Sequence, residues 1–362
     1  MKERRKRNMS GTGLLFLFCL LMLCGCAQIT GFMEKTEVSG REVESLAAEK
    51  EDDTVLLGGM PVGIYMETDG VLVLDTEKMT GMDGKEYTPA QGVVSSGDYI
   101  TEVNHQKIEG KKQLMDLVEH LDGEKVLLTV RRENTILEKK LTPVQISKGN
   151  YRLGIWVRDN VQGLGTITFL TKNNRFAALG HGIHDIDTST LLTIKRGTLY
   201  RTSIQKVQKG SKGNPGTMEG IIVYNRFHRL GVIEKNTDAG IYGELNSDRS
   251  WIGEEVPIQV AKKEEIKTGE ARIRCYIDGE VKEYTICITQ IDKESDQVNK
   301  GMVIQVTDTE LLEKTGGIIQ GMSGSPIIQN GKLIGAVTHV FVQDSTKGYG
   351  IFIENMLKEE ES

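Results

Sequence analysis

The alternation of apolar and polar residues from position 150 onward predicts many short strands and little helix. Apolar or alternating runs recur there, separated by segments rich in turn-forming residues. These runs are Gly163–Leu170, Arg175–Leu179, Gly220–Tyr224, Val256–Val260, Ala271–Ile277, Tyr284–Thr289, Met302–Val306, Pro326–Ile328, Lys332–Val337 and Gly348–Ile353. Only Thr309–Lys314 has the spacing of a helical turn. Short strands in this number indicate a barrel or a sandwich.

Residues 55–145 follow a different pattern, which mixes strands with one helix. Val71–Leu74 is a candidate buried strand, and Ser96–Asn104 reads as a turn that runs into a second strand. Apolar residues at i, i+3, i+4 and i+7 predict an amphipathic helix over Lys111–His120, and Lys125–Arg131 follows as a strand. The order strand, turn, strand, helix, strand resembles that of a PDZ domain, so we expect an α/β module of that kind.

The resemblance to a PDZ domain implies a peptide-binding site. PDZ domains add an extended peptide to a sheet edge and hold its terminal carboxylate with backbone N–H groups. The matching loop here is Gly58–Ile64, whose glycines let the backbone approach closely, although Pro61 removes one donor. A purely structural Gly-Pro turn is the alternative. We expect peptide C-termini or internal segments to bind at Gly59, Val62, Gly63 and Ile64.

The first 30 residues have the pattern of an export signal. Five basic residues within the first seven positions precede an apolar core, Leu14–Leu23. That core is short for a membrane span of about 20 residues and is typical of a secretory signal peptide. Leu23-Cys24-Gly25-Cys26 resembles a lipoprotein cleavage box with Cys26 as the lipidated residue, and an uncleaved anchor is the third reading. All three place the rest of the chain outside the cytoplasm, associated with the membrane through its N-terminus or released.

Charge limits the range of partners. The formal net charge of −6 argues against nucleic acid, because duplex binding requires a basic surface. Residues 31–54 are polar and charged, which is typical of a linker.

Two cysteines, Cys275 and Cys287, lie outside the export signal, on either side of a predicted hairpin whose turn is Asp278-Gly279. The hairpin sets Cys275 opposite Lys282, so Cys287 is displaced along its strand by about 17 Å at ~3.3 Å per residue. A disulfide requires Cα atoms within about 7 Å, so we expect free thiols. No Cys or His spacing indicates zinc, and we expect neither metal nor cofactor.

The loop Gly321–Pro326 is the strongest candidate for chemistry. Serine is a weak nucleophile until a base takes its proton and donors stabilise the oxyanion. Small neighbours let the chain turn sharply at Ser323, so that the backbone N–H groups of Gly321 and Ser323 can point at one spot. The loop resembles the Gly-Asp-Ser-Gly-Gly-Pro of chymotrypsin-like peptidases, with Met322 and Ser325 as departures. Ser323 is the predicted nucleophile and Ser325 its rival, while a tight turn before a strand is the structural alternative.

The base that activates Ser323 should be one of six histidines. His181 follows a run of small residues that ends a predicted strand, which suits a base at a strand terminus, and His184 is a weaker rival. The other four lie on predicted surfaces, in an undistinctive frame or in an apolar strand, and are His105, His120, His228 and His339.

A carboxylate should fix the tautomer of the histidine and stabilise the imidazolium. Asp185 and Asp187 are too close in sequence to His181 to reach its ring from behind. Asp238 lies in a predicted turn, and Asp308 could equally be a helix N-cap. Spacing does not choose between these last two.

Four segments together resemble the SpoIVB peptidase family, the sporulation stage IV B serine peptidases of spore-forming Firmicutes. They are Gly154–Asp159, Ala178–Ile183 with Asp185, Asp187 and Thr188, Gly316–Pro326, and Gly348–Ile351. The family shares the order seen here, with a PDZ domain at 55–145 followed by a chymotrypsin-like β-barrel peptidase domain at 150–362. The resemblance implies a triad of His181 as base, Asp308 as orienting carboxylate and Ser323 as nucleophile.

The resemblance also implies a role. The family peptidase is exported into the space between the two membranes around the forespore, where it cleaves itself and a membrane-embedded regulator of an intramembrane metalloprotease. That protease then releases a mother-cell sigma factor. We therefore expect a sporulation signalling serine endopeptidase whose PDZ domain governs recognition. The alternative is a PDZ-bearing adaptor with a degenerate peptidase fold, against which the complete set of Ser, His and Asp argues.

Overall fold

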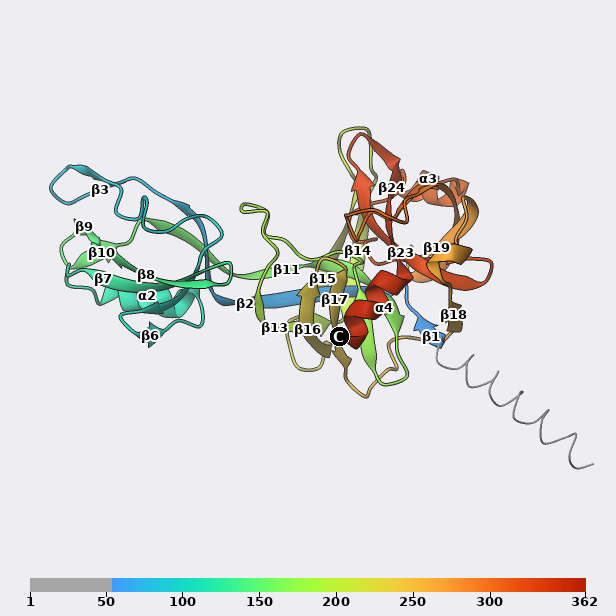
Figure 1. Cartoon of the computed structure of the whole chain (residues 1–362), viewed down its shortest axis with the longest axis horizontal. Helices are drawn as coiled ribbons and strands as arrows, with labels where there is room; N and C mark the ends of the chain where they lie inside the picture. Colours follow the sequence, from blue (N-terminus) through green and yellow to red (C-terminus); the bar gives the residue numbers. More distant parts are fainter. Residues whose placement is uncertain (1–53) are drawn as a thin grey trace, which may run out of the picture. The chain divides into compact units, whose positions relative to one another are not determined.

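The computed structural model describes residues 54–362 (Figure 1). The predicted export signal at 1–30, its cleavage box and all but the last residue of the predicted linker at 31–54 lie outside this part. Within it, no helix is long and apolar enough to cross a membrane.

Two strands of 16 residues each belong to two modules at once, and they are β2 (Pro61–Thr76) and β11 (Ile155–Leu170). They pair antiparallel along most of their length. The first half of β2 supplies Val62, Ile64 and Met66 to one core, and its second half supplies Val71 and Val73 to another.

Gly70 marks the point at which β2 passes from one core to the other. Its φ is +88°, and a Cβ there would lie 2.7 Å from the carbonyl oxygen of Ile100. Both the backbone conformation and the close approach require glycine.

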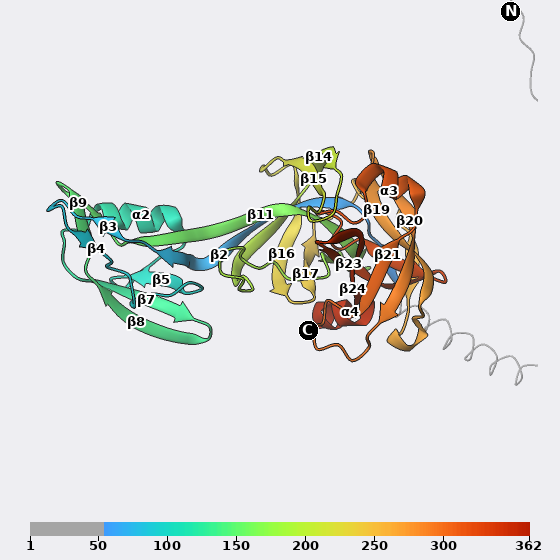
Figure 2. The same ribbon diagram turned by 90° about the horizontal axis from the view of Figure 1, so that it is seen from above.

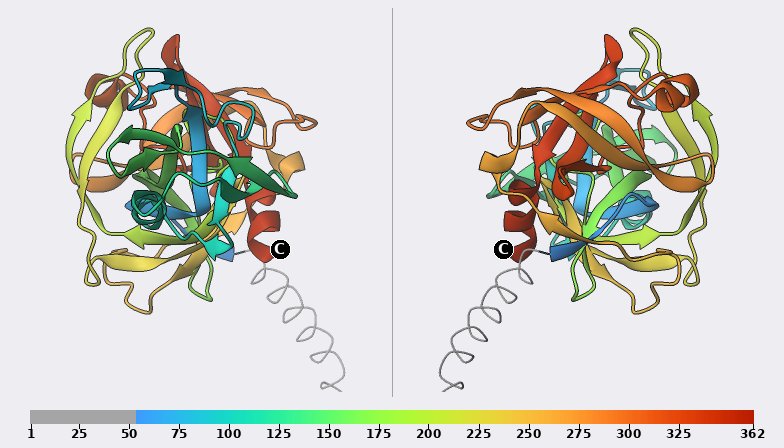
Figure 3. Two further views of the ribbon diagram at one scale, coloured as in Figure 1. Left: turned by 90° about the vertical axis from the view of Figure 1, so that its left-hand side faces the viewer. Right: turned by 90° about the vertical axis from the view of Figure 1, so that its right-hand side faces the viewer.

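The PDZ-like module is a small sheet with one helix packed on it (Figure 3, left). Its sheet runs β2–β5–β7–β8, all antiparallel. The predicted helix and the strand after it are confirmed. Besides β2 and β11, the elements are β3 (Met79–Thr80), β4 (Glu86–Tyr87), β5 (Tyr99–Val103), β6 (Gln106–Lys107), α2 (Lys111–Glu119), β7 (Val126–Arg132), β8 (Thr135–Leu141), β9 (Val144–Ser147) and β10 (Asn150–Arg152).

The boundaries predicted for this module, 55 and 145, do not match the strand pairing. β1 (Thr54–Leu57) pairs with the end of β11 and with β18 (Pro257–Val260), so the chain begins its described part inside the peptidase module. The PDZ-like module is therefore inserted between β2 and β11 of the peptidase module. Local periodicity marks strands but not their partners, which is why the boundary was misplaced.

The first half of the peptidase module is a closed antiparallel barrel. Its strands follow the ring β2–β11–β12–β17–β16–β13 and back to β2. The strands not yet introduced are β12 (Arg175–Ala178), β13 (Ile194–Tyr200), β16 (Arg229–Thr237) and β17 (Gly240–Leu245).

The second half is another closed antiparallel barrel (Figure 3, right). Its ring runs β19–β20–β21–β24–β23–β22 and back to β19. Two such barrels in sequence make the predicted chymotrypsin-like fold. The elements are β19 (Gly269–Ile277), β20 (Glu280–Ile291), β21 (Met302–Val306), β22 (Pro326–Gln329), β23 (Lys332–Phe341) and β24 (Asp344–Phe352), with the helices η1 (Lys263–Glu265), α3 (Thr309–Thr315) and α4 (Ile353–Glu361).

The predicted hairpin between β19 and β20 is present with the expected register. Cys275 lies opposite Lys282, and Cys287 lies opposite Glu270. Both cysteines are free thiols.

Candidate active site

Ser323 lies in a loop that both barrels hold. Its carbonyl oxygen accepts a hydrogen bond from the Thr166 N–H on β11, at 3.0 Å. The next residue, Gly324, donates its N–H to the Val337 carbonyl on β23, at 2.8 Å. The Ser323 hydroxyl donates to the Thr338 carbonyl at 2.7 Å. The nucleophile predicted from sequence is thus placed where the first barrel meets the second.

Two backbone N–H groups of this loop are left without an acceptor. Within residues 54–362, neither Gly321 nor Ser323 donates its N–H to a protein atom, while the N–H groups of Met322 and Ser325 are both engaged. Gly321 has a φ of +102°, and its carbonyl oxygen is held by the Thr166 hydroxyl at 2.8 Å. Free donors beside a serine hydroxyl are what an oxyanion hole requires.

Ser325, the rival nucleophile, is excluded by burial. It is fully buried, and its hydroxyl oxygen has no hydrogen-bond partner in the described part of the chain. A substrate carbonyl cannot reach it, whereas Ser323 is only half-buried.

His181 stands beside the strand that holds Ser323. It follows β12 through Leu179 and Gly180, both with positive φ. A Cβ on Gly180 would lie 3.1 Å from the Thr338 side chain, so the histidine segment packs on the residue whose carbonyl receives the Ser323 hydroxyl.

The ring of His181 is held on two sides. Its Nδ1 lies 2.8 Å from the Gly182 carbonyl oxygen. Because a carbonyl can only accept, Nδ1 carries the proton and Nε2 keeps the lone pair of a base. The other contact is His339 on β23, whose ring centroid lies 4.5 Å away. The sequence placed His339 only in an apolar strand, and its contact with His181 becomes visible once the two barrels are seen together.

Asp308, the carboxylate carried over from the family, lies at the start of α3 (Thr309–Thr315) in the second barrel. It is the N-cap of α3, and its Oδ1 accepts the Leu311 N–H at 3.1 Å. Its Oδ2 accepts the Thr285 N–H at 3.2 Å. Both oxygens are therefore used by the backbone of the second barrel, which favours the N-cap reading, and the catalytic assignment of Asp308 stays a prediction.

Asp238, the other carboxylate left open by the sequence, lies in the turn between β16 and β17. That turn packs on the histidine segment, since a Cβ on Gly182 would lie 2.6 Å from the Thr237 carbonyl oxygen. The Asp238 Oδ1 lies 3.6 Å from Nε2 of His184. The structure therefore brings Asp238 to His184, three residues after the predicted base.

Asp185 and Asp187 have a structural role. Both pair with Arg158 on β11, at 2.8 Å in the case of Asp187. Asp185 is fully buried, and its Oδ1 also accepts the N–H groups of Asp187 and Thr188. This cluster fixes the loop after His181.

The loop predicted to bind peptide carboxylates lies elsewhere. Val62 and Ile64 are buried in the core of the first barrel, and a Cβ on Gly63 would meet the Ile222 side chain at 2.7 Å. Gly59 packs on Arg274 of the second barrel. The assignment of these four residues to a PDZ site is therefore corrected, because Gly58–Ile64 leads into a barrel strand.

The PDZ-like module has a groove of its own, of about 500 Å³, between α2 and residues 149–157. Leu114, Met115 and Val118 line it from the helix, and Trp156 lines it from the start of β11. Met115 and Trp156 are 54% and 59% exposed, which leaves apolar surface open to a ligand.

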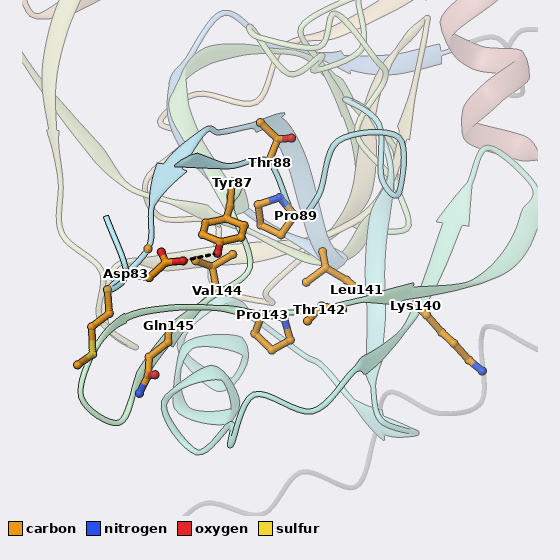
Figure 4. Close-up of a pocket in the computed structure, with 12 residues that line it drawn as sticks. Asp83, Tyr87, Thr88, Pro89, Lys140, Leu141, Thr142, Pro143, Val144 and Gln145 are labelled. Atoms are coloured by element: carbon orange, nitrogen blue, oxygen red, sulfur yellow. Dashed lines mark hydrogen bonds between the residues drawn. The ribbon is translucent and has the colours of Figure 1, made fainter. Parts of the chain in front are cut away.

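A second hollow of about 620 Å³ lies between the β3–β4 hairpin and residues 140–145 (Figure 4). The Tyr87 hydroxyl donates to Asp83 across its wall, at 2.8 Å. None of the predicted catalytic residues lines this hollow.

The strands β14 (Thr202–Gln208) and β15 (Thr217–Ile222) form a hairpin (Figure 2). Its turn and the start of β15 are hydrogen-bonded to the chain just before the nucleophile loop. Gln320 donates its N–H to the Gly216 carbonyl at 2.8 Å and accepts the Met218 N–H at 2.9 Å. Gly210 donates its N–H to the Thr315 carbonyl at 2.8 Å. The position of Gly321 therefore depends on this hairpin. No local sequence pattern predicts this dependence.

Solved structures similar to this chain include a PDZ domain and two proteases. The PDZ domain of the SdrC-like protein Lmo2051 of Listeria monocytogenes is 24% identical over 25% of this chain and 87% of its own, with a TM-score of 0.20. The active form of the Rv3671c protease of M. tuberculosis is 16% identical over 56% of this chain and 73% of its own, with a TM-score of 0.31. The HtrA-type protease AlgW with a tripeptide is 12% identical over 54% of each chain, with a TM-score of 0.33.

A curated relative is a putative zinc metalloprotease of Helicobacter pylori, 31% identical over 110 residues. The match covers 27% of this chain and 31% of that protein. Residues 54–362 contain no group of three His, Cys, Asp or Glu side chains that could hold a metal ion.

The model of one family, SpoIVB peptidase S55, matches residues 149–357, which is more than half of the chain. The matched range includes the whole segment from His181 to the loop of Ser323. The chain belongs to the SpoIVB peptidase S55 family and is a serine peptidase.

Proposed function

We propose that this chain is a sporulation signalling endopeptidase that cleaves itself and a membrane-embedded regulator of an intramembrane metalloprotease, and so triggers activation of a mother-cell sigma factor. The observation that carries the peptidase chemistry is the loop of Ser323. Its hydroxyl and two free N–H groups lie together where the barrels meet, beside the segment of His181. Membership of the family supports the signalling role.

The proposed mechanism uses Ser323 as nucleophile and His181 as base. Nε2 of His181 takes the hydroxyl proton while Oγ attacks the scissile carbonyl, and the N–H groups of Gly321 and Ser323 stabilise the oxyanion. His181 then gives its proton to the leaving amine, which releases the first product. Water hydrolyses the acyl-enzyme with the same histidine as base.

We assign the third role to Asp238. In the described conformation it contacts His184, whose Nδ1 shares the Gly182 carbonyl with Nδ1 of His181. A carboxylate there favours the imidazolium that forms when Ser323 loses its proton.

Protein substrates are the expected partners of a peptidase with a PDZ-like module. The groove between α2 and β11 supports peptide binding, because it is apolar and bordered by the exposed edge of a helix and a strand. The basic and apolar pattern of the first 30 residues supports export to the space between the forespore and mother-cell membranes, with the N-terminus anchored or cleaved.

Labelling by a fluorophosphonate separates a peptidase from a non-catalytic adaptor. We expect the wild-type chain and Ser325→Ala to be labelled and to cleave themselves, and Ser323→Ala to do neither. The matched serine controls for changes in the loop. An unlabelled wild type would favour the adaptor, and self-cleavage by Ser323→Ala with an unchanged pattern would remove Ser323 from its role.

The acid limb of kcat/KM is expected below pH 6.5. Partial burial lowers the pKa of His181 from its usual 6.5, and nearby His184 lowers it as well, while the Gly182 carbonyl opposes them. Since the base must be neutral, a lowered pKa keeps the enzyme active at more acidic pH. His184→Gln removes one lowering effect, so the limb should move to higher pH. His120→Gln, in the PDZ-like module, should leave it in place; an unshifted limb in His184→Gln would contradict this electrostatic link.

A further inference from the structure

Residues 200–230 carry a charge opposite to that of the whole chain. They include six basic residues against a single acidic one, Glu219, whereas the chain as a whole has a net charge of −6. The basic residues are Arg201, Lys206, Lys209, Lys212, Arg226 and Arg229, and all six are exposed. The segment comprises the end of β13, the β14–β15 hairpin and the loop that leads into β16.

Four large apolar side chains are exposed within seven residues of the same segment. Ile221, Val223, Tyr224 and Phe227 are 56%, 43%, 48% and 78% exposed. Single exposed apolar residues are normal on a protein surface, but four within one short segment indicate a binding surface. We refer to residues 221–229 as the docking loop.

The docking loop is held in shape by the barrel beneath it. The Tyr224 ring packs edge-on against Tyr65 and Tyr200, with centroids 5.5 Å and 5.2 Å away. Arg201 donates its N–H to the His228 carbonyl at 2.7 Å, which closes the loop. The exposure of its apolar side chains is therefore a property of an ordered surface.

Phe227 stands out from that surface with a cation beside it. The Asn225 side chain accepts the N–H of Phe227 at 2.9 Å and fixes the turn. The Arg226 guanidinium lies 4.7 Å from the centre of the Phe227 ring. A protruding ring with an arginine beside it fits a fluid surface that can close around it, and arginine pairs well with phosphate.

We propose that the docking loop, with Arg201, binds an anionic lipid surface. Ile221, Val223 and Phe227 enter the boundary between headgroups and acyl chains, and the arginines pair with lipid phosphates. The proposal goes beyond the proposed function and stands on this surface alone, independent of whether Ser323 is the nucleophile.

Docking in this way would set the height of the nucleophile loop above the lipid. β15 begins at Thr217, which is bridged to Gln320, and ends at Ile222. Five residues of strand span about 17 Å at ~3.3 Å per residue. Cleavage would then favour peptide bonds just outside a membrane.

Tryptophan quenching by brominated lipid tests the contact on the full chain. The vesicles are brominated phosphatidylcholine with or without phosphatidylglycerol. We expect Phe227→Trp to show quenching beyond that of the wild type on phosphatidylglycerol vesicles only, with at least a tenfold loss of binding in 0.5 M salt. Ile136→Trp on β8, a position that is 60% exposed, is the matched control and should add none. The N-terminus is common to all three proteins, so its contribution cancels.

Charge reversal supplies the second arm. Arg201→Glu, Arg226→Glu and Arg229→Glu, combined with Phe227→Trp, should abolish the added quenching while the Tm stays near that of the wild type. Equal quenching of Ile136→Trp and Phe227→Trp would overturn the proposal. Equal quenching of Phe227→Trp on vesicles with and without phosphatidylglycerol would overturn it as well. So would a Phe227→Trp emission that responds to a soluble acidic peptide and not to lipid.

Discussion

Asp238→Asn is expected to lower kcat for peptide cleavage by about 10²–10⁴-fold, the range for loss of a base or of the carboxylate that orients it. Asp308→Asn is expected to leave kcat within a few-fold of the wild type. The reason is geometric, because Asp238 contacts His184, which shares the Gly182 carbonyl with His181, whereas both Asp308 oxygens accept backbone N–H groups at the start of α3. Asparagine also caps helices well, so the cap survives that substitution.

Steady-state kinetics and thermal unfolding of both variants check this expectation. Asp308→Ala serves as the control for the cap, since its loss should cost about 1 kcal/mol of stability and lower the Tm without changing the pH dependence of kcat. An inactive Asp308→Asn protein with an unchanged Tm would return the third catalytic role to Asp308.

Gly216→Ala is expected to lower kcat by about 10²–10³-fold, which is the usual effect of losing one oxyanion donor, with little change in KM. A Cβ at this position would lie 2.3 Å from the Gln208 carbonyl oxygen and 2.6 Å from the Ile319 side chain. The hairpin must therefore shift away from Gln320, which releases the chain that places the Gly321 N–H. The effect falls on the transition state, because the ground-state carbonyl gains little from that donor.

Gly163→Ala is the matched control for the hairpin variant. The position lies on β11 with nothing within 4 Å of an added Cβ, so kcat and Tm should both stay close to the wild type. Measurement of kcat and KM on one peptide substrate, together with Tm, separates positioning from unfolding. A folded Gly216→Ala enzyme with full kcat would show that Gly321 keeps its geometry without the hairpin.

The chemistry of the loop and the strand content could be predicted from sequence because both are local. Small residues around Ser323 are needed for its turn, and the run before His181 is a short apolar run of the kind that forms a buried strand. The turn Asp278-Gly279 fixed the register of its hairpin, so the separation of Cys275 from Cys287 followed directly and is confirmed.

What sequence could not supply depends on long-range pairing. A glycine-rich entry such as Gly58–Ile64 looks the same whether it forms a carboxylate-binding loop or leads into a barrel strand. Asp308 has the local pattern of an N-cap, and the structure shows that cap, with both carboxylate oxygens accepting backbone N–H groups. The contact between His339 and His181 joins segments of different barrels, so the sequence alone does not show it.

The continuity of β11 has a mechanical consequence. Its first residues, Ile155 and Trp156, line the groove of the PDZ-like module, and its Thr166 holds the carbonyl oxygens of Gly321 and Ser323. No hinge loop interrupts the strand from Trp156 to Thr166, only bulges that let it bend. A ligand that binds in the groove and displaces the start of β11 therefore twists the same strand that holds the nucleophile loop. Occupancy of the groove and the alignment of the oxyanion donors are therefore coupled through one continuous strand.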